Sequence, residues 1–68
     1  MDQIKIGKFI AECRKKKNLT QENLSKMINI HRTYYSMIEN GKRNPSLQVA
    51  ISLKRALNYQ NDDIFEKQ

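Results

Sequence analysis

The chain has 68 residues, a formal charge of +6 from 13 Lys and Arg against seven Asp and Glu, and one cysteine. A chain of this length forms one small domain, residues 1–68, with too little core to wall a deep substrate cleft. An enzyme is therefore a poor interpretation. One His and one Cys are too few for a zinc site, and no apolar run approaches the roughly 20 residues of a membrane span.

The positive charge is not evenly distributed. Residues 1–60 carry twelve basic and four acidic side chains, whereas residues 61–68 carry one basic and three acidic. A positive body with a negative tail favours one face that binds a polyanion. Cys13 can form no internal disulfide, and the N-terminus has no signal-peptide pattern, so we expect a cytoplasmic protein without a membrane segment.

Hydrophobic periodicity predicts five helices and no strand. The first spans about Ile4 to Lys17, with Lys side chains in its last turn, where positive charge suits the helix dipole. Asn18 is expected to end it in the left-handed conformation. The predicted buried face of this helix carries Ile6, Phe9, Ile10 and Cys13.

The second and third predicted helices are short and adjacent. Thr20 is the expected N-cap of the second, which runs to about Ile28, and Asn29 breaks it with a positive φ. The third begins after His31 and runs to about Asn40. The expected apolar face of the second comprises Leu24, Met27 and Ile28, and Tyr35 and Ile38 are expected to face inward from the third.

The last two predicted helices complete the fold. Ser46 is the expected N-cap of the fourth, which runs to about Leu57 and is closed by Asn58. A fifth is expected from about residue 61 to 66. The predicted inner face of the fourth comprises Leu47, Ala50, Leu53 and Leu57, with Ile51 beside it.

Residues 20–40 have the features of a helix-turn-helix. Ser25 is a small residue where two helices must approach closely, and the turn former Asn29 follows four residues later. The second helix of this unit keeps a free outer face, which can enter the major groove with its N-terminal end first. That face carries Arg32, Thr33, Ser36 and Met37.

Three stretches, 19–25, 35–46 and 56–57, read LTQENLS, YSMIENGKRNPS and AL. With them the chain resembles the helix-turn-helix domain of phage repressors and Cro proteins, the xenobiotic-response-element type, over nearly its whole length. The resemblance implies a compact five-helix, all-α bundle like that of lambda repressor. It also implies a sequence-specific transcription regulator of bacterial or phage origin, most simply a repressor, that binds an inverted-repeat operator as a homodimer.

The resemblance assigns roles to individual residues. Arg32, Thr33, Ser36 and Met37 would face base edges of double-stranded DNA. Gln21, His31, Asn40, Lys42 and Arg43 would hold phosphates, and Gln21 would also brace the first residue of the third helix. Arg14 and Glu39 match a pair that forms an internal salt bridge.

Side-chain chemistry agrees with these roles. Arg32 can make a bidentate contact to guanine, and the methyl groups of Thr33 and Met37 suit the thymine methyl. Lys42 and Arg43 suit phosphates, which position a protein without specifying a sequence.

Five positions depart from the family pattern, and one of them is Lys54, which stands where the family often has Ala. The Ser25 hydroxyl must bond back to its own helix, and the turn residue Asn29 stands where the family has Gly. His31 is a poorer N-cap than the usual Ser or Thr. Tyr35 replaces an Ile or Val, so its hydroxyl needs a partner.

Tyr59, Ile64 and Phe65 are the candidates for a homodimer interface, and the alternative is that all three close the core. A dimer would set two recognition helices about 34 Å apart, one turn of DNA. We expect no cofactor, no metal and no small-molecule ligand.

A protein-interaction or RNA-binding module on the same fold remains the other interpretation. Tyr34 and Met37 lean toward it, whereas Arg32, Lys42 and Arg43 favour DNA. A steep fall of affinity with salt would indicate phosphate neutralisation and so discriminate between a protein and a nucleic acid.

Overall fold

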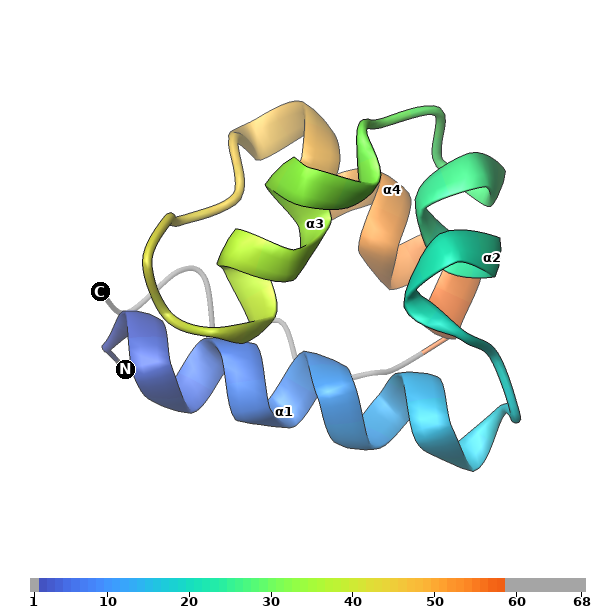
Figure 1. The fold of residues 1–68 in the computed structure, drawn as a ribbon, viewed down its shortest axis with the longest axis horizontal. Helices are drawn as coiled ribbons and strands as arrows, with labels where there is room; N and C mark the ends of the chain where they lie inside the picture. Colours follow the sequence, from blue (N-terminus) through green and yellow to red (C-terminus); the bar gives the residue numbers. More distant parts are fainter. Residues whose placement is uncertain (1, 59–68) are drawn as a thin grey trace.

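The computed structural model describes residues 2–58, which form four α-helices and no strand (Figure 1). The helices are α1 (Gln3–Lys16), α2 (Gln21–Met27), α3 (Arg32–Glu39) and α4 (Leu47–Leu57). The all-helical class is confirmed. The five-helix count is not, because the structure defines four helices and the one expected at about 61–66 lies outside the described residues.

Three of the four helices begin at a side-chain cap. Asp2, Thr20 and Ser46 each accept a hydrogen bond from the backbone N–H three residues on, as expected for Thr20 and Ser46. The Thr20 amide in turn donates to Asn23 Oδ1 at 3.4 Å, which completes a capping box. His31 has the extended backbone of an N-cap but makes no side-chain cap bond, so α3 begins with a weak cap.

Left-handed residues end or follow α1, α2 and α4. Asn18 and Asn29 both have φ of 58°, and Asn58 has φ of 54°. These are the positions at which the sequence predicts chain reversal, because Asn tolerates a positive φ better than most residues with a Cβ. Gly41, with φ of 74°, turns the chain after α3. Local chemistry therefore sets the helix ends with little help from packing.

The core lies where α3 packs against α1 and α2. Figure 1 shows α2 and α3 resting on α1, with α4 behind them. The Ser25 hydroxyl donates to the backbone carbonyl of Glu22 at 2.9 Å, so the small residue at the α2–α3 contact bonds back to its own helix. The buried core residues are Ile6, Ile10, Leu24, Tyr35, Ile38, Ala50, Leu53 and Leu57.

Two apolar residues expected to face the core do not. Leu47 is 79% exposed and Met27 is 57% exposed. At about 100° per residue, Leu47 lies about 80° from Leu57 and about 120° from Leu53 around α4, at the edge of the buried stripe. Met27 is the last residue of the seven-residue helix α2, so its side chain lies at the end of the helix rather than over the core.

Gly7 allows α1 to cross the C-terminal end of α3 at close range. A Cβ at Gly7 would lie 2.4 Å from the carbonyl oxygen of Glu39 and 2.5 Å from that of Ile38. Both neighbours are backbone atoms and cannot rotate away. The same crossing is tied by Gln3, whose Nε2 donates to the Gly41 carbonyl at 3.1 Å.

Replacing Gly7 with Ala should destabilise the fold by roughly 1–3 kcal/mol, despite the better helix propensity of Ala, because α1 must move away from α3. Lys8→Ala, one residue on and exposed, is the control and should change the free energy of unfolding by less than about 0.5 kcal/mol. Urea denaturation measures both. Equal midpoints for the two variants would show that the crossing adjusts without cost.

Candidate nucleic-acid interface

The exposed side of α3 carries a shallow hollow of about 340 Å³, which we call the α3 hollow. All four residues expected to contact bases line it, and two of those expected to hold phosphates join them. The lining residues are Arg32, Thr33, Ser36, Met37, Asn40 and Lys42. The set holds two cations and no carboxylate, so the α3 hollow suits an anionic partner.

A second hollow of about 520 Å³ opens at the N-terminal end of α2, and we call it the α2 hollow. It is lined by Arg14, Leu19, Thr20, Gln21, Glu22 and Arg32. Arg32 lines both hollows, so they adjoin at the first residue of α3. We call the two hollows together the trough; their lining residues extend from the end of α3 to the start of α2.

Two further residues expected at the interface, His31 and Arg43, lie beside this trough. Lys42 and Arg43 are exposed in the turn after α3. The Lys42 amide donates to the Met37 carbonyl at 2.9 Å, which fixes where the turn leaves the helix. His31 is exposed at the start of α3, and neither His31 nor Arg43 lines either hollow.

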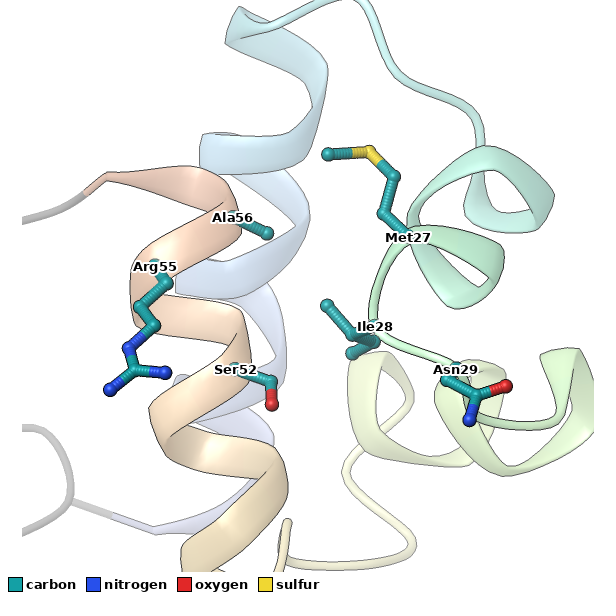
Figure 2. A pocket seen from close by; sticks show the side chains of 6 residues that line it. All are labelled: Met27, Ile28, Asn29, Ser52, Arg55 and Ala56. Atoms are coloured by element: carbon teal, nitrogen blue, oxygen red, sulfur yellow. The ribbon is translucent and has the colours of Figure 1, made fainter.

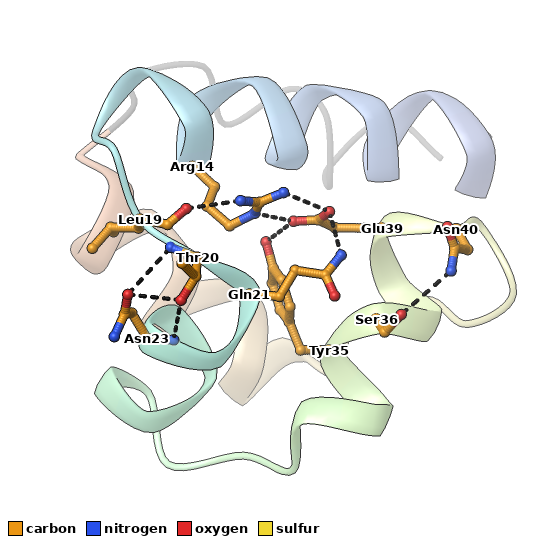
Figure 3. Close-up of polar contacts among 9 residues, drawn as sticks. All are labelled: Arg14, Leu19, Thr20, Gln21, Asn23, Tyr35, Ser36, Glu39 and Asn40. Atoms are coloured by element: carbon orange, nitrogen blue, oxygen red, sulfur yellow. Dashed lines mark hydrogen bonds and ion pairs between the residues drawn. The ribbon is translucent and has the colours of Figure 1, made fainter.

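Behind the trough, three polar side chains meet around one carboxylate, that of Glu39 (Figure 3). Arg14 Nε donates to Glu39 Oε2 at 2.7 Å, which is the expected ion pair. Gln21 Nε2 donates to Oε1 at 2.9 Å, and the Tyr35 hydroxyl donates to Oε2. Arg14 Nη1 also donates to the Leu19 carbonyl at 2.7 Å. This Glu39 cluster thus joins α1, α2 and α3.

The cluster is charged and nearly sealed from water. The side chains of Arg14 and Glu39 are 11% and 6% exposed. Burial alone would raise the pKa of Glu39, but the hydrogen bonds from Arg14, Tyr35 and Gln21 outweigh it and hold that pKa below its ordinary value. The hydrogen bond to Glu39 raises the pKa of Arg14, and burial followed by the same carboxylate raises the pKa of Tyr35. Glu39 is therefore ionised and fully bonded.

Sequence reasoning found half of this cluster. It paired Arg14 with Glu39 but left the Tyr35 hydroxyl without a partner and gave Gln21 a different one. Gln21 was expected to brace the first residue of α3, and its side-chain amide instead bonds Glu39, the last residue. Tyr35 and Glu39 stand four apart on one helix and so share a face, a spacing that could have revealed their bond.

Tyr34 does not point freely into solvent. It is half-buried, and its hydroxyl accepts a hydrogen bond from the Ser46 amide at 3.3 Å, which ties α3 to the start of α4. The interpretation of α3 as a protein-binding helix counted Tyr34 among the bulky outward residues. The structure removes that support.

A third hollow, of about 400 Å³, lies between the end of α2 and α4 (Figure 2). Ser52 and Ala56 point into it from α4 toward Met27 and Ile28, whereas the Arg55 guanidinium is turned away. Elsewhere, burial raises the pKa of the Cys13 thiol. Cys13 is half-buried and packs against the hydrophobic core. Among residues 2–58, no cluster of His, Cys, Asp and Glu could hold a metal ion.

The short helices α2 and α3, joined by the turn at Asn29, define a helix-turn-helix protein. The family model described as helix-turn-helix matches residues 10–63, so the chain belongs to this family of transcriptional regulators. No helix within the described part of the chain has the length and hydrophobicity needed to cross a bilayer.

The relatives include regulators from archaea and bacteria. An uncharacterized HTH-type transcriptional regulator of Archaeoglobus fulgidus is 43% identical over 56 residues, which are 82% of this chain and 79% of that protein. Control protein C.MunI of a Mycoplasma species is 50% identical over 46 residues, 66% of this chain and 62% of that protein. The crystal structure of the restriction-modification controller protein C.AhdI from Aeromonas hydrophila matches with a TM-score of 0.84 and 33% identity, over 93% of this chain and 96% of that one.

Removing the Glu39 carboxylate should be costly. Glu39→Ala leaves Arg14 charged and partly buried without its partner, which should lower the free energy of unfolding by roughly 3–5 kcal/mol. Glu22→Ala removes an exposed carboxylate and should lower it by less than about 1 kcal/mol. Thermal or urea unfolding compares the two. Similar losses in both variants would show that the cluster adds little to stability.

The depressed pKa of Glu39 also predicts a pH dependence. Stability from the cluster is fully present above the ordinary carboxyl pKa of 4.5, and it is lost as pH falls through the lower pKa of the folded state. The free energy of unfolding should therefore decrease as the pH falls below about 4.5. In Glu39→Gln, the free energy of unfolding should depend less on pH in this acid range. If its pH dependence there equals that of the wild type, other carboxylates cause the loss of stability.

Proposed function

We propose that this protein is a repressor that binds an inverted-repeat operator as a homodimer, with α3 in the major groove. The observation that carries the proposal is the α3 hollow, where hydrogen-bonding, methyl-bearing and cationic side chains share an exposed helix face with no carboxylate. A helix of eight residues with such a face fits the width of the major groove.

Recognition of the DNA bases is proposed to centre on Arg32 and Thr33. Both are exposed in the first turn of α3, the end that enters the groove. The Arg32 guanidinium can donate to guanine O6 and N7, and the Thr33 methyl can meet a thymine methyl. Ser36 and Met37, one turn on and half-buried, reach bases with less freedom.

Phosphate contacts are proposed on both sides of α3. Lys42 and Arg43 are exposed just beyond its end, and Asn40 lines the α3 hollow beside Lys42. His31 stands at its start. One N–H of Gln21 is bonded to Glu39, and a side-chain amide has two, so the other remains available to a phosphate oxygen.

A dimer is proposed because one α3 reads too little DNA. Eight helical residues span about 12 Å, which covers only a few base pairs. A second copy would double the site and place two half-sites of an inverted repeat about 34 Å apart. Tyr59, Ile64 and Phe65 are the proposed contact residues and lie outside the described residues.

Selection of bound sequences from a random duplex pool, at moderate salt, tests this function. The wild-type protein should recover an inverted repeat, and Arg32→Ala should relax one position per half-site, with a loss of roughly 1–3 kcal/mol against the preferred base. Lys42→Ala is the matched control. It should weaken binding to all sequences alike and lower the salt slope by about one.

Two outcomes would contradict the proposal. A folded protein that recovers no motif does not act through sequence-specific DNA binding. Recovery of a motif that Arg32→Ala leaves unchanged would place the recognition surface elsewhere than α3.

A further inference from the structure

A hydrogen bond joins two side chains that line the α3 hollow. Asn40 Nδ2 donates to Ser36 Oγ at 3.4 Å, at the end of α3 (Figure 3). Ser36 belongs to the proposed base contacts and Asn40 to the proposed phosphate contacts, so the bond connects the two groups. An amide nitrogen only donates, whereas a hydroxyl can donate one hydrogen bond and accept two. Asn40 therefore uses part of the accepting capacity of Ser36 and none of its donating capacity.

The Ser36 proton has no acceptor among residues 2–58. A serine within a helix often donates to a backbone carbonyl of the preceding turn. Ser25 does so, since its hydroxyl donates to the Glu22 carbonyl at 2.9 Å. Ser36 makes no such bond within the described part of the chain, and it is half-buried where it lines the α3 hollow. Its oxygen is thus bonded, and its proton is left for a ligand.

A duplex seated on α3 would exclude water from the Ser36 hydroxyl. A polar group that loses water without gaining a partner costs free energy. Here the group without a partner is the proton, because the oxygen already has Asn40. In the major groove guanine presents the acceptors N7 and O6, adenine presents N7 and thymine presents O4, whereas cytosine presents only the N4 donor. Three of the bases can take the Ser36 proton, and cytosine cannot.

We propose that Asn40 is a positioning residue for base recognition. Its bond to Ser36 makes that hydroxyl a donor toward DNA, so the base that faces Ser36 is guanine, adenine or thymine and not cytosine. The inference rests on the proposed function, because it states which bases one of the proposed contacts accepts. Asn40 acts through Ser36 and does not touch the base. Its second N–H remains for the proposed phosphate contact.

Relative affinities for four duplexes test this inference. The duplexes share the selected repeat and differ only in the base at the position that Ser36→Ala relaxes. The wild-type protein should bind the duplex with cytosine at this position about fivefold more weakly than the other three. Asn40→Ala should reduce this ratio to about twofold or less, because the hydroxyl can then donate to its own helix and accept from cytosine N4.

Asn40→Asp is the sharper variant. A carboxylate takes the Ser36 proton and leaves only oxygen lone pairs for the base, so the cytosine duplex should bind about threefold more tightly than the thymine duplex. The added charge weakens binding to all four duplexes alike and cancels in the ratio. A purely structural role for Asn40 would lower the four affinities without changing their order.

Asn44→Ala is the matched control. Asn44 is an exposed amide in the turn after α3 and lines neither hollow. Its removal should leave the ratio between cytosine and the other bases as it is in the wild type. Thermal unfolding of each variant checks that the compared proteins are folded.

The outcomes separate the inference from the function it rests on. A folded wild-type protein that recovers no repeat from the random pool overturns the proposed function. A repeat that Arg32→Ala relaxes, with unchanged base ratios in Asn40→Ala and Asn40→Asp, overturns the role of Asn40 alone. The same holds if Ser36→Ala relaxes no position, or if the wild type prefers cytosine at the position that it does relax.

Discussion

The Glu39 carboxylate is the constraint on which the arrangement of helices depends. It stands at the last residue of α3 and takes hydrogen bonds from Arg14 of α1, Gln21 of α2 and Tyr35 of α3 itself. A buried charge is tolerated only when its bonds are satisfied, so the three helices can meet in few other ways. Gly7 supports the same geometry, because it lets α1 pass directly over the backbone at Glu39.

The cluster also separates two arginines of identical chemistry into different roles. Arg14 and Arg32 both line the α2 hollow. Arg14 is committed to Glu39 and the Leu19 carbonyl, and it is therefore a structural residue. Arg32 has no such partner among residues 2–58 and is left for the ligand. Whether an exposed basic residue is structural or left to bind a ligand thus depends on the groups that its neighbours already bond, which composition cannot reveal.

Helix positions could be predicted from sequence because their determinants are local. Thr20 and Ser46 cap the helices that follow them, and Asn18, Asn29 and Asn58 take positive φ where the chain turns. The side-chain partners of Gln21 and Tyr35 depend on how three helices meet, so periodicity could not supply them. The prediction that Leu47 faces the core was wrong for a related reason. The hydrophobic pattern locates the apolar stripe of a helix, but packing determines which residues at the edge of that stripe are exposed to solvent.

The proposed recognition helix, α3, is largely a core element, and this limits how it could read DNA. Tyr35 and Ile38 are buried, Tyr34, Ser36 and Met37 are half-buried, and the Glu39 side chain is 6% exposed. Only Arg32 and Thr33, in its first turn, are exposed. A helix anchored by its packed side and by Glu39 at its end holds the backbone of these two residues in a fixed position. A domain of this size has room for few contact residues. It can still be selective if those few residues are held rigidly in place.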